Sequence, residues 1–145
     1  MKSFEAEYAM EYAIRDAYKM CEQRGDETGM EEARSLMRKH LDEIAQKGDF
    51  YAFVYRLYKE MKEAGNEHID LHEAIFDAPK MLEKLKSCGV KSFTFSSGWS
   101  GAVETAWEFQ QNGCRLEGLV ELNGTTKDWI TGEREKVHGY LFSIQ

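Results

Sequence analysis

The sequence changes character after Gly89, and this change constrains the fold more than any other feature. Before it, apolar residues recur every three or four positions between charged ones, which is typical of amphipathic helices. After it, shorter segments alternate apolar and polar residues with the period of a strand. We therefore expect an α+β protein, with a helical part over 1–89 and a small βαββ sheet unit over 90–145. Because three strands rarely stand alone, we expect residues 1–145 to form a single domain.

Three longer helices and two short ones are expected in the helical part. The spacing predicts them over 3–24, 28–47, 50–64, 70–76 and 79–88. Thr28-Gly29-Met30-Glu31 has the capping-box pattern of a helix start, and Asp70-Leu71-His72-Glu73 has a related capping pattern. A stripe of alanines at Ala6, Ala9, Ala13 and Ala17 lets a neighbouring helix approach the first helix closely.

The sheet unit is expected to contain three strands and one helix. The pattern predicts strands over 90–95, 114–122 and 137–144 and a helix over 99–111. In the strand 114–122, the apolar residues from Cys114 to Leu122 share one face at a two-residue period. The helix permits a right-handed parallel crossover between the first two strands, and the last two can form a hairpin around a polar loop over 123–135.

Composition excludes several classes of function. The chain has 19 Lys and Arg against 26 Asp and Glu, for a formal net charge of −7. Non-specific nucleic-acid binding needs a basic stripe, so we expect no direct nucleic-acid partner. No segment approaches the ~20 apolar residues of a membrane span, and residues 1–30 hold no apolar leader. Three widely spaced cysteines without a CxxC pair indicate reduced thiols, so we expect a cytoplasmic protein without a membrane partner.

The segment 93–104 is the most informative one for function. It predicts a strand, a tight Ser/Gly turn and a helix, and backbone N–H groups at such a turn can hold a phosphate or carboxylate. The candidate ligand-binding residues are Ser96, Ser97, Gly98, Ser100 and Gly101. In the architectural alternative, the serines cap the helix and the glycines supply the turn geometry. No dinucleotide or P-loop motif is present, so no cofactor is indicated.

A serine hydrolase is the catalytic alternative at the same turn. Gly98-Trp99-Ser100-Gly101-Ala102 matches a relaxed nucleophile elbow, and Asp128 and His138 follow in the order that α/β-hydrolases use. Ser100 would attack an acyl carbon, His138 would accept its proton and Asp128 would orient the histidine. Only one predicted strand precedes the turn, and the chain is much shorter than a hydrolase core. Both facts favour the architectural interpretation.

A histidine pair suggests a metal site, although the pattern is incomplete. His68 and His72 are four residues apart, with Asp70 and Glu73 beside them. Two histidines at that spacing share one face of a helix and can bind one ion. If Asp70 caps the predicted helix, however, His68 lies outside it, and no third ligand is evident. We therefore expect no metal site.

Several motifs in the second half of the chain are distinctive: Phe93-Thr94-Phe95-Ser96-Ser97, Trp99-Ser100, Ala102-Val103-Glu104-Thr105-Ala106-Trp107, Gly113-Cys114-Arg115-Leu116-Glu117-Gly118 and Gly139-Tyr140-Leu141-Phe142. Through these motifs, residues 81–145 resemble a family of small uncharacterised proteins carried on bacterial mobile elements such as conjugative transposons. The resemblance implies a bacterial, cytoplasmic, accessory setting. It implies no activity, cofactor or functional residue.

Trp129 lies in the polar loop over 123–135, where an exposed tryptophan would be a natural anchor for a partner protein. With weak signals for catalysis, the sequence favours a non-enzymatic, acidic protein-binding or regulatory accessory protein. The alternatives are a small-ligand or anion-binding domain, or a serine hydrolase, centred on 95–104. The sequence leaves the oligomeric state open.

Overall fold

The computed structural model describes residues 1–145 and confirms the α+β class, with five helices and a four-stranded mixed sheet. In chain order the elements are α1 (Lys2–Arg24), α2 (Glu27–Gln46), α3 (Asp49–Ala64), β1 (Ile69–Leu71), α4 (Ala78–Ser87), β2 (Ser92–Phe95), α5 (Ala102–Gln111), β3 (Cys114–Lys127) and β4 (Arg134–Ile144). The chain divides into two compact units, Met1–Tyr55 and Arg56–Gln145. The expectation of one domain stays a prediction. None of the helices combines the length and the apolar character that a bilayer crossing requires.

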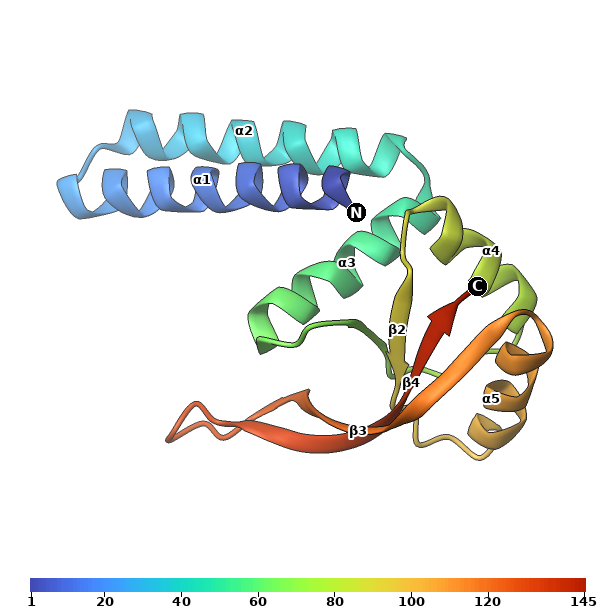
Figure 1. The fold of residues 1–145 in the computed structure, drawn as a ribbon. Helices are drawn as coiled ribbons and strands as arrows, with labels where there is room; N and C mark the ends of the chain where they lie inside the picture. Colours follow the sequence, from blue (N-terminus) through green and yellow to red (C-terminus); the bar gives the residue numbers. More distant parts are fainter. The chain divides into compact units, whose positions relative to one another are not determined.

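The first unit is built on the paired antiparallel helices α1 and α2 (Figure 1). α1 ends at Gly25, whose left-handed conformation (φ 68°) lets the chain reverse. α2 then begins one residue before the expected Thr28, because the N-cap is Asp26. The Asp26 carboxylate accepts a hydrogen bond from the Gly29 N–H at 2.9 Å, so the capping box at Thr28 is not used.

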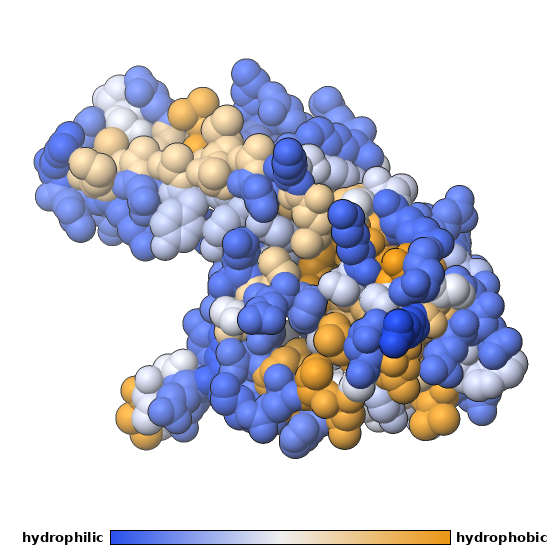
Figure 2. Space-filling model, viewed as in Figure 1, coloured by the Kyte–Doolittle hydropathy of each residue, from blue (hydrophilic) through white to orange (hydrophobic).

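The alanine stripe of α1 faces solvent, which corrects the expectation that it meets a neighbouring helix. Ala6, Ala9, Ala13 and Ala17 are exposed, and Met10 among them is 56 % exposed. The buried residues of α1 are Phe4, Glu11 and Ile14. Figure 2 shows a pale orange band along the paired helices. Of the buried residues, Phe4 contacts the rings of Tyr51 and Tyr55 on α3, at centroid distances of 4.9 and 6.0 Å.

The sheet of the second unit has the order β1-β2-β4-β3, with β1 parallel to β2 and the other pairs antiparallel. β1 replaces the short helix predicted over 70–76. Ile69 and Leu71 are both buried, and Ile69 lies opposite Phe93 in the ladder with β2. Burial at alternate positions is the pattern of a strand, and it outweighs the capping pattern that begins at Asp70.

The hairpin of β3 and β4 is longer than predicted and extends beyond the rest of the sheet (Figure 1). Its strands continue to Lys127 and resume at Arg134, so the loop shrinks to 128–133. The expected common face of 114–122 is wrong, because a bulge lies between Leu116 and Gly118. Leu116 pairs with Phe142, whereas Gly118 pairs with Leu141, so the residues that follow lie on the opposite face.

The two faces of the sheet differ in chemistry. One face carries an aromatic core, in which Phe109 of α5 contacts Phe93, Phe95 and Phe142 at ring-centroid distances of 5.2, 5.4 and 5.5 Å. On the other face the side chains of Asp70 and Thr94 hydrogen-bond to each other. We call these the aromatic face and the polar face. The candidate site lies on the polar face.

Candidate functional site

The Ser/Gly turn is held by contacts within the protein. The Ser96 hydroxyl donates to Asp70 Oδ2 at 2.6 Å, and the Ser97 hydroxyl accepts from the Trp99 N–H at 3.5 Å. A Cβ at Gly101 would overlap the Trp99 ring, so the tryptophan packs directly on that glycine. The carboxylate beside Ser96 disfavours an anion at this end of the turn. Anion binding by Ser96, Ser97, Gly98, Ser100 and Gly101 stays a prediction, as does the architectural alternative.

No hydrogen bond or ion pair joins Ser100, Asp128 and His138. Ser100 is exposed in the turn. The Asp128 carboxylate accepts from the backbone N–H groups of Ile130 and Thr131, each at 2.8 Å. These bonds hold the pKa of Asp128 below its usual value. His138 on β4 is 68 % exposed and lies 3.8 Å from Glu121 across the β3–β4 ladder. The catalytic triad is therefore not assembled in this structure.

The two histidines beside β1 have separate partners. His68 Nδ1 lies 3.0 Å from the Ser92 hydroxyl, whereas His72 Nε2 lies 2.9 Å from Glu60 Oε2. Because residues 69–71 form a strand, the helical pair geometry does not exist. No group of three or more His, Cys, Asp or Glu side chains is placed to hold a metal ion.

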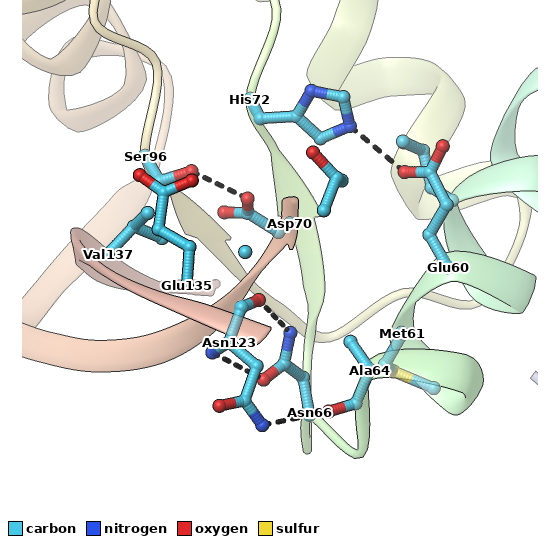
Figure 3. A pocket seen from close by; sticks show the side chains of 13 residues that line it. Glu60, Met61, Ala64, Asn66, Asp70, His72, Ser96, Asn123, Glu135 and Val137 are labelled. Carbon is cyan, nitrogen blue, oxygen red and sulfur yellow. Dashed lines mark hydrogen bonds and ion pairs between the residues drawn. The ribbon is translucent and has the colours of Figure 1, made fainter. Parts of the chain in front are cut away.

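A cavity of about 130 Å³ opens on the polar face (Figure 3). Asp70 and Ser96 contribute its polar side, and Leu57 and Met61 of α3 contribute apolar side chains. The part of the β3–β4 hairpin next to its loop completes the lining, with Val137 among its residues. We call this cavity the Asp70 hollow. It brings together residues that are far apart in the sequence and includes one of the predicted ligand-binding residues, Ser96.

Asp70 is the most distinctive group in the hollow. Its carboxylate accepts hydrogen bonds from the hydroxyls of Thr94 at 2.8 Å and Ser96 at 2.6 Å. Burial raises the pKa of Asp70 above its usual value, and the two hydroxyl bonds act in the opposite direction. Glu60, across the hollow, differs because Arg56 lies 3.2 Å from its Oε1 and His72 lies 2.9 Å from its Oε2. The carboxylate of Asp70 is therefore bonded by hydroxyls, while that of Glu60 is bonded by groups that can carry positive charge.

Two asparagines fix one wall of the hollow. The Asn66 side chain donates to the Asn123 carbonyl at 2.8 Å and accepts from the Asn123 N–H at 3.0 Å. The Asn123 side chain donates in turn to the Ala64 carbonyl at 2.8 Å. These three bonds join the end of α3 to β3 across more than fifty residues of sequence. The wall is thus formed before any ligand binds.

Sequence reasoning missed Asp70, His72 and Glu60 as partners in one site. The available signal was the alternation His68-Ile69-Asp70-Leu71-His72, in which polar and apolar residues exchange at every position. That period is typical of a strand with one polar face. The capping pattern over the same residues favours a helix instead, and the two local patterns are in conflict.

The tip of the β3–β4 hairpin presents two apolar side chains to solvent. Trp129 is 91 % exposed and Ile130 is 74 % exposed. Besides the two bonds to its carboxylate, Asp128 donates its N–H to the Glu133 carbonyl at 2.7 Å and accepts from the Gly132 N–H at 2.9 Å. In Figure 2 hydrophobic colour is visible at the far end of the hairpin. We call residues 128–133 the hairpin tip; Asp128 fixes its backbone, which holds Trp129 outward.

Comparison with known proteins identifies one family. The model of the family described as Domain of unknown function (DUF7698) matches residues 53–144, which include the whole sheet, the Asp70 hollow and the hairpin tip. No curated protein and no solved structure matches the chain. Because the match spans well over half of the 145 residues, the chain belongs to the DUF7698 family.

Proposed function

We propose that this protein is a non-enzymatic binding protein that recognises another protein through the hairpin tip. The observation that carries this proposal is the exposure of Trp129 and Ile130 on a backbone that Asp128 holds closed. Large side chains that are exposed in the free protein gain most when a partner covers them, and tryptophan is enriched among residues that dominate binding energy. A tip already fixed by hydrogen bonds also loses less conformational entropy on binding.

The charges around the tip favour a protein over a membrane or a nucleic acid. Lys127 and Arg134 flank the tip, and Asp128 and Glu133 lie within it, so the formal charges cancel. Segments that bind anionic lipid or nucleic acid carry an excess of Lys and Arg, which is lacking here. The formal net charge of −7 for the whole chain acts in the same direction.

The test compares a substitution of Trp129 with a substitution of a second exposed tryptophan outside the hairpin tip. A photo-crosslinking residue at position 130 captures partners from the native host, and recovery is compared for wild type, Trp129→Ala and Trp107→Ala. Trp107 is the control because it is also exposed, at 58 %, but lies on α5. We expect Trp129→Ala to lose at least about tenfold in recovery of one defined partner, which is the size of a hot-spot loss. Trp107→Ala should retain recovery.

Three results would contradict the proposal. Identical partner profiles for wild type and Trp129→Ala would remove Trp129 from the interaction. Equal losses in the two tryptophan variants would show a general effect of removing exposed apolar area. Binding of the protein to vesicles of mixed anionic and neutral lipids, lost in Trp129→Ala, would make the tip a membrane contact. Light scattering after size exclusion would identify a partner that is a second copy of this chain.

The setting is part of the same proposal. The resemblance of residues 81–145 supports an accessory protein of a bacterial mobile element. The three cysteines, Cys21, Cys88 and Cys114, are unpaired, which supports a reducing compartment such as the cytoplasm. We propose no cofactor and no nucleic-acid partner for this role.

A further inference from the structure

We propose that the Asp70 hollow binds an organic cation through its ammonium or guanidinium group, with the head of the ligand at Asp70. This inference concerns a different part of the unit from the hairpin tip and does not depend on the proposed function. It rests on three properties of the cavity: its excess of carboxylates over basic groups, its small size with an apolar wall, and its fixed shape.

The charge of the hollow favours a cation. Its lining includes the carboxylates of Glu60, Asp70 and Glu135 but no lysine or arginine. The one basic side chain in the lining, His72, lies 2.9 Å from Glu60 and acts on Asp70 only through the electrostatic field. Glu60 is already bonded to Arg56 and His72. The two hydrogen-bond partners of Asp70, by contrast, are neutral hydroxyls. Removing a carboxylate from water without an opposite charge is unfavourable, and the raised pKa of Asp70 is the corresponding response to burial. A cation in the hollow would supply the missing charge.

The size and walls of the hollow indicate which kind of cation. About 130 Å³ is the space of about four water molecules at ~30 Å³ each, well below the ~300 Å³ of sites for larger ligands. An ammonium or guanidinium head with a short carbon stem suits this volume. Leu57, Met61 and Val137 offer apolar surface to such a stem. The lining includes no three groups placed for a bare metal ion.

The hollow is also pre-formed, which distinguishes it from an acidic patch on a mobile surface. The Asn66–Asn123 bonds fix the wall between α3 and β3. At Gly124 a Cβ would lie 3.2 Å from Val137 Cγ1 and 3.3 Å from the Glu135 carbonyl oxygen, so the two hairpin strands are closely packed at the rim. Arg134 further ties the rim by donating to the Gly124 carbonyl at 3.1 Å. Little conformational entropy is lost when a ligand enters such a site.

The experiment titrates the full-length, isotope-labelled protein with three small probes and follows backbone amide shifts by NMR. n-Butylammonium and n-butylguanidinium carry the proposed head groups, and n-butanol is the neutral control with the same stem. We expect saturable shifts at Asp70, Ser96 and Asn123 with at least one cation. n-Butanol should bind at least about tenfold more weakly, because it lacks a charge-assisted hydrogen bond to Asp70.

Three variants test the assignment. Asp70→Asn should weaken cation binding at least about tenfold, and Glu135→Gln, on the exposed rim, should weaken it a few-fold. Glu83→Gln on α4 removes an exposed carboxylate outside the hollow and should leave affinity unchanged. If Asp70→Asn does not fold, Glu135→Gln alone decides. Equal affinity for n-butanol, unchanged affinity in the variant that decides, or no saturable shift with either cation would overturn the proposal.

A second pair of probes separates a free amine from the side chain of a protein. N-acetyl-lysine methylamide presents the same ammonium on a peptide backbone, and its Nε-acetylated form removes the charge. Binding of n-butylammonium with exclusion of the lysine derivative identifies a free amine as the natural ligand class. Tighter binding of the lysine derivative than of n-butylammonium, lost on Nε-acetylation, identifies a lysine side chain. Binding of the acetylated form with equal affinity would contradict a role for charge.

Discussion

The two faces of the sheet in Arg56–Gln145 are made by the same strands, but one carries an apolar core and the other a polar cavity. On the aromatic face, Phe93 and Phe95 of β2 are 0 % and 2 % exposed and contact Phe109. On the polar face, Thr94, between them in sequence, is 3 % exposed but hydrogen-bonds to Asp70. Burial alone therefore does not distinguish the faces. What differs is whether the buried side chains are apolar or polar.

This difference shows how a small domain combines a core with a binding site. Successive residues of a strand point to opposite faces, so a tetrapeptide such as Ser92–Phe95 contributes to both. Apolar burial on one face stabilises the fold without directional requirements. Burial of polar side chains on the polar face requires hydrogen-bond partners at specific positions. The Asp70 hollow is the part of that face that the surrounding side chains do not fill. Stability and recognition thus depend on neighbouring residues of the same strand.

The largest expected effect lies on the aromatic face. Phe109→Ala removes a side chain with 0 % exposure that contacts three other phenylalanines. Loss of that burial and the remaining cavity should lower the free energy of unfolding by about 3–5 kcal/mol, measured by urea denaturation. Val103→Ala on the same helix, at 72 % exposure, is the control and should change it by less than about 0.5 kcal/mol. If the two substitutions lowered the free energy of unfolding equally, the aromatic face would not be the main source of stability.

A smaller loss is expected at the wall of the hollow. Asn66→Ala removes two hydrogen bonds to the backbone of Asn123 and leaves partly buried groups without partners. The free energy of unfolding should fall by about 1–3 kcal/mol. Gln111→Ala, an exposed amide at the end of α5, should have little effect. Amide hydrogen exchange at Asn123 measures the local consequence, and unchanged protection there would show that the wall is held by other contacts.

The ionisation of Asp70 should make the stability of the protein depend on pH, which tests the chemistry of the polar face. Because its pKa is raised in the folded protein, its contribution to stability is fully present below the ordinary value of 3.8 and is lost as pH rises through the folded pKa. The free energy of unfolding of wild type minus that of Asp70→Asn should therefore increase as pH falls from neutral towards 3.8. Denaturation of both proteins over a pH series measures it.

Asp128 supplies a control of opposite sign. The backbone N–H groups of Ile130 and Thr131 hold its pKa below 3.8 in the folded protein. Its contribution is present above 3.8 and is lost as pH falls through the folded value. The difference between wild type and Asp128→Asn should therefore decrease on acidification. If both differences in the free energy of unfolding changed in the same direction on acidification, the environments assigned to Asp70 and Asp128 would be wrong.

The smallest effect on stability is expected at the hairpin tip. Trp129→Ala should change the free energy of unfolding by less than about 0.5 kcal/mol, because the side chain is 91 % exposed. Thermal or urea denaturation measures it. A loss comparable to that of Phe109→Ala would mean that Trp129 packs on the domain in solution, which would remove the basis of the proposed function.

Periodicity and glycine stops predicted most of the helices and the hairpin. These signals gave the wrong element where two local patterns overlapped. Residues from Asp70 match a helix-capping pattern, but they form the strand β1, which is stabilised by pairing with β2. The signals failed also at the bulge between Leu116 and Gly118, where Gly118 inside the strand pattern was the available signal. Of the site, Ser96 and Trp129 were singled out from sequence. Glu60 and Asn123 were not, and Asp70 was considered only as a helix cap and as a neighbour of His68 and His72. Their proximity depends on the topology of the sheet and not on spacing along the chain.

The pKa of the Asp70 carboxyl, followed by carbon-detected NMR in the free protein and with saturating n-butylammonium, tests the central claim most directly. We predict a value above 3.8 in the free protein, because desolvation of the partly buried carboxylate outweighs its hydroxyl bonds and the field of His72, and a decrease when the cation binds. A value at or below 3.8 that does not move on addition of the cation would contradict a polar face built to receive positive charge.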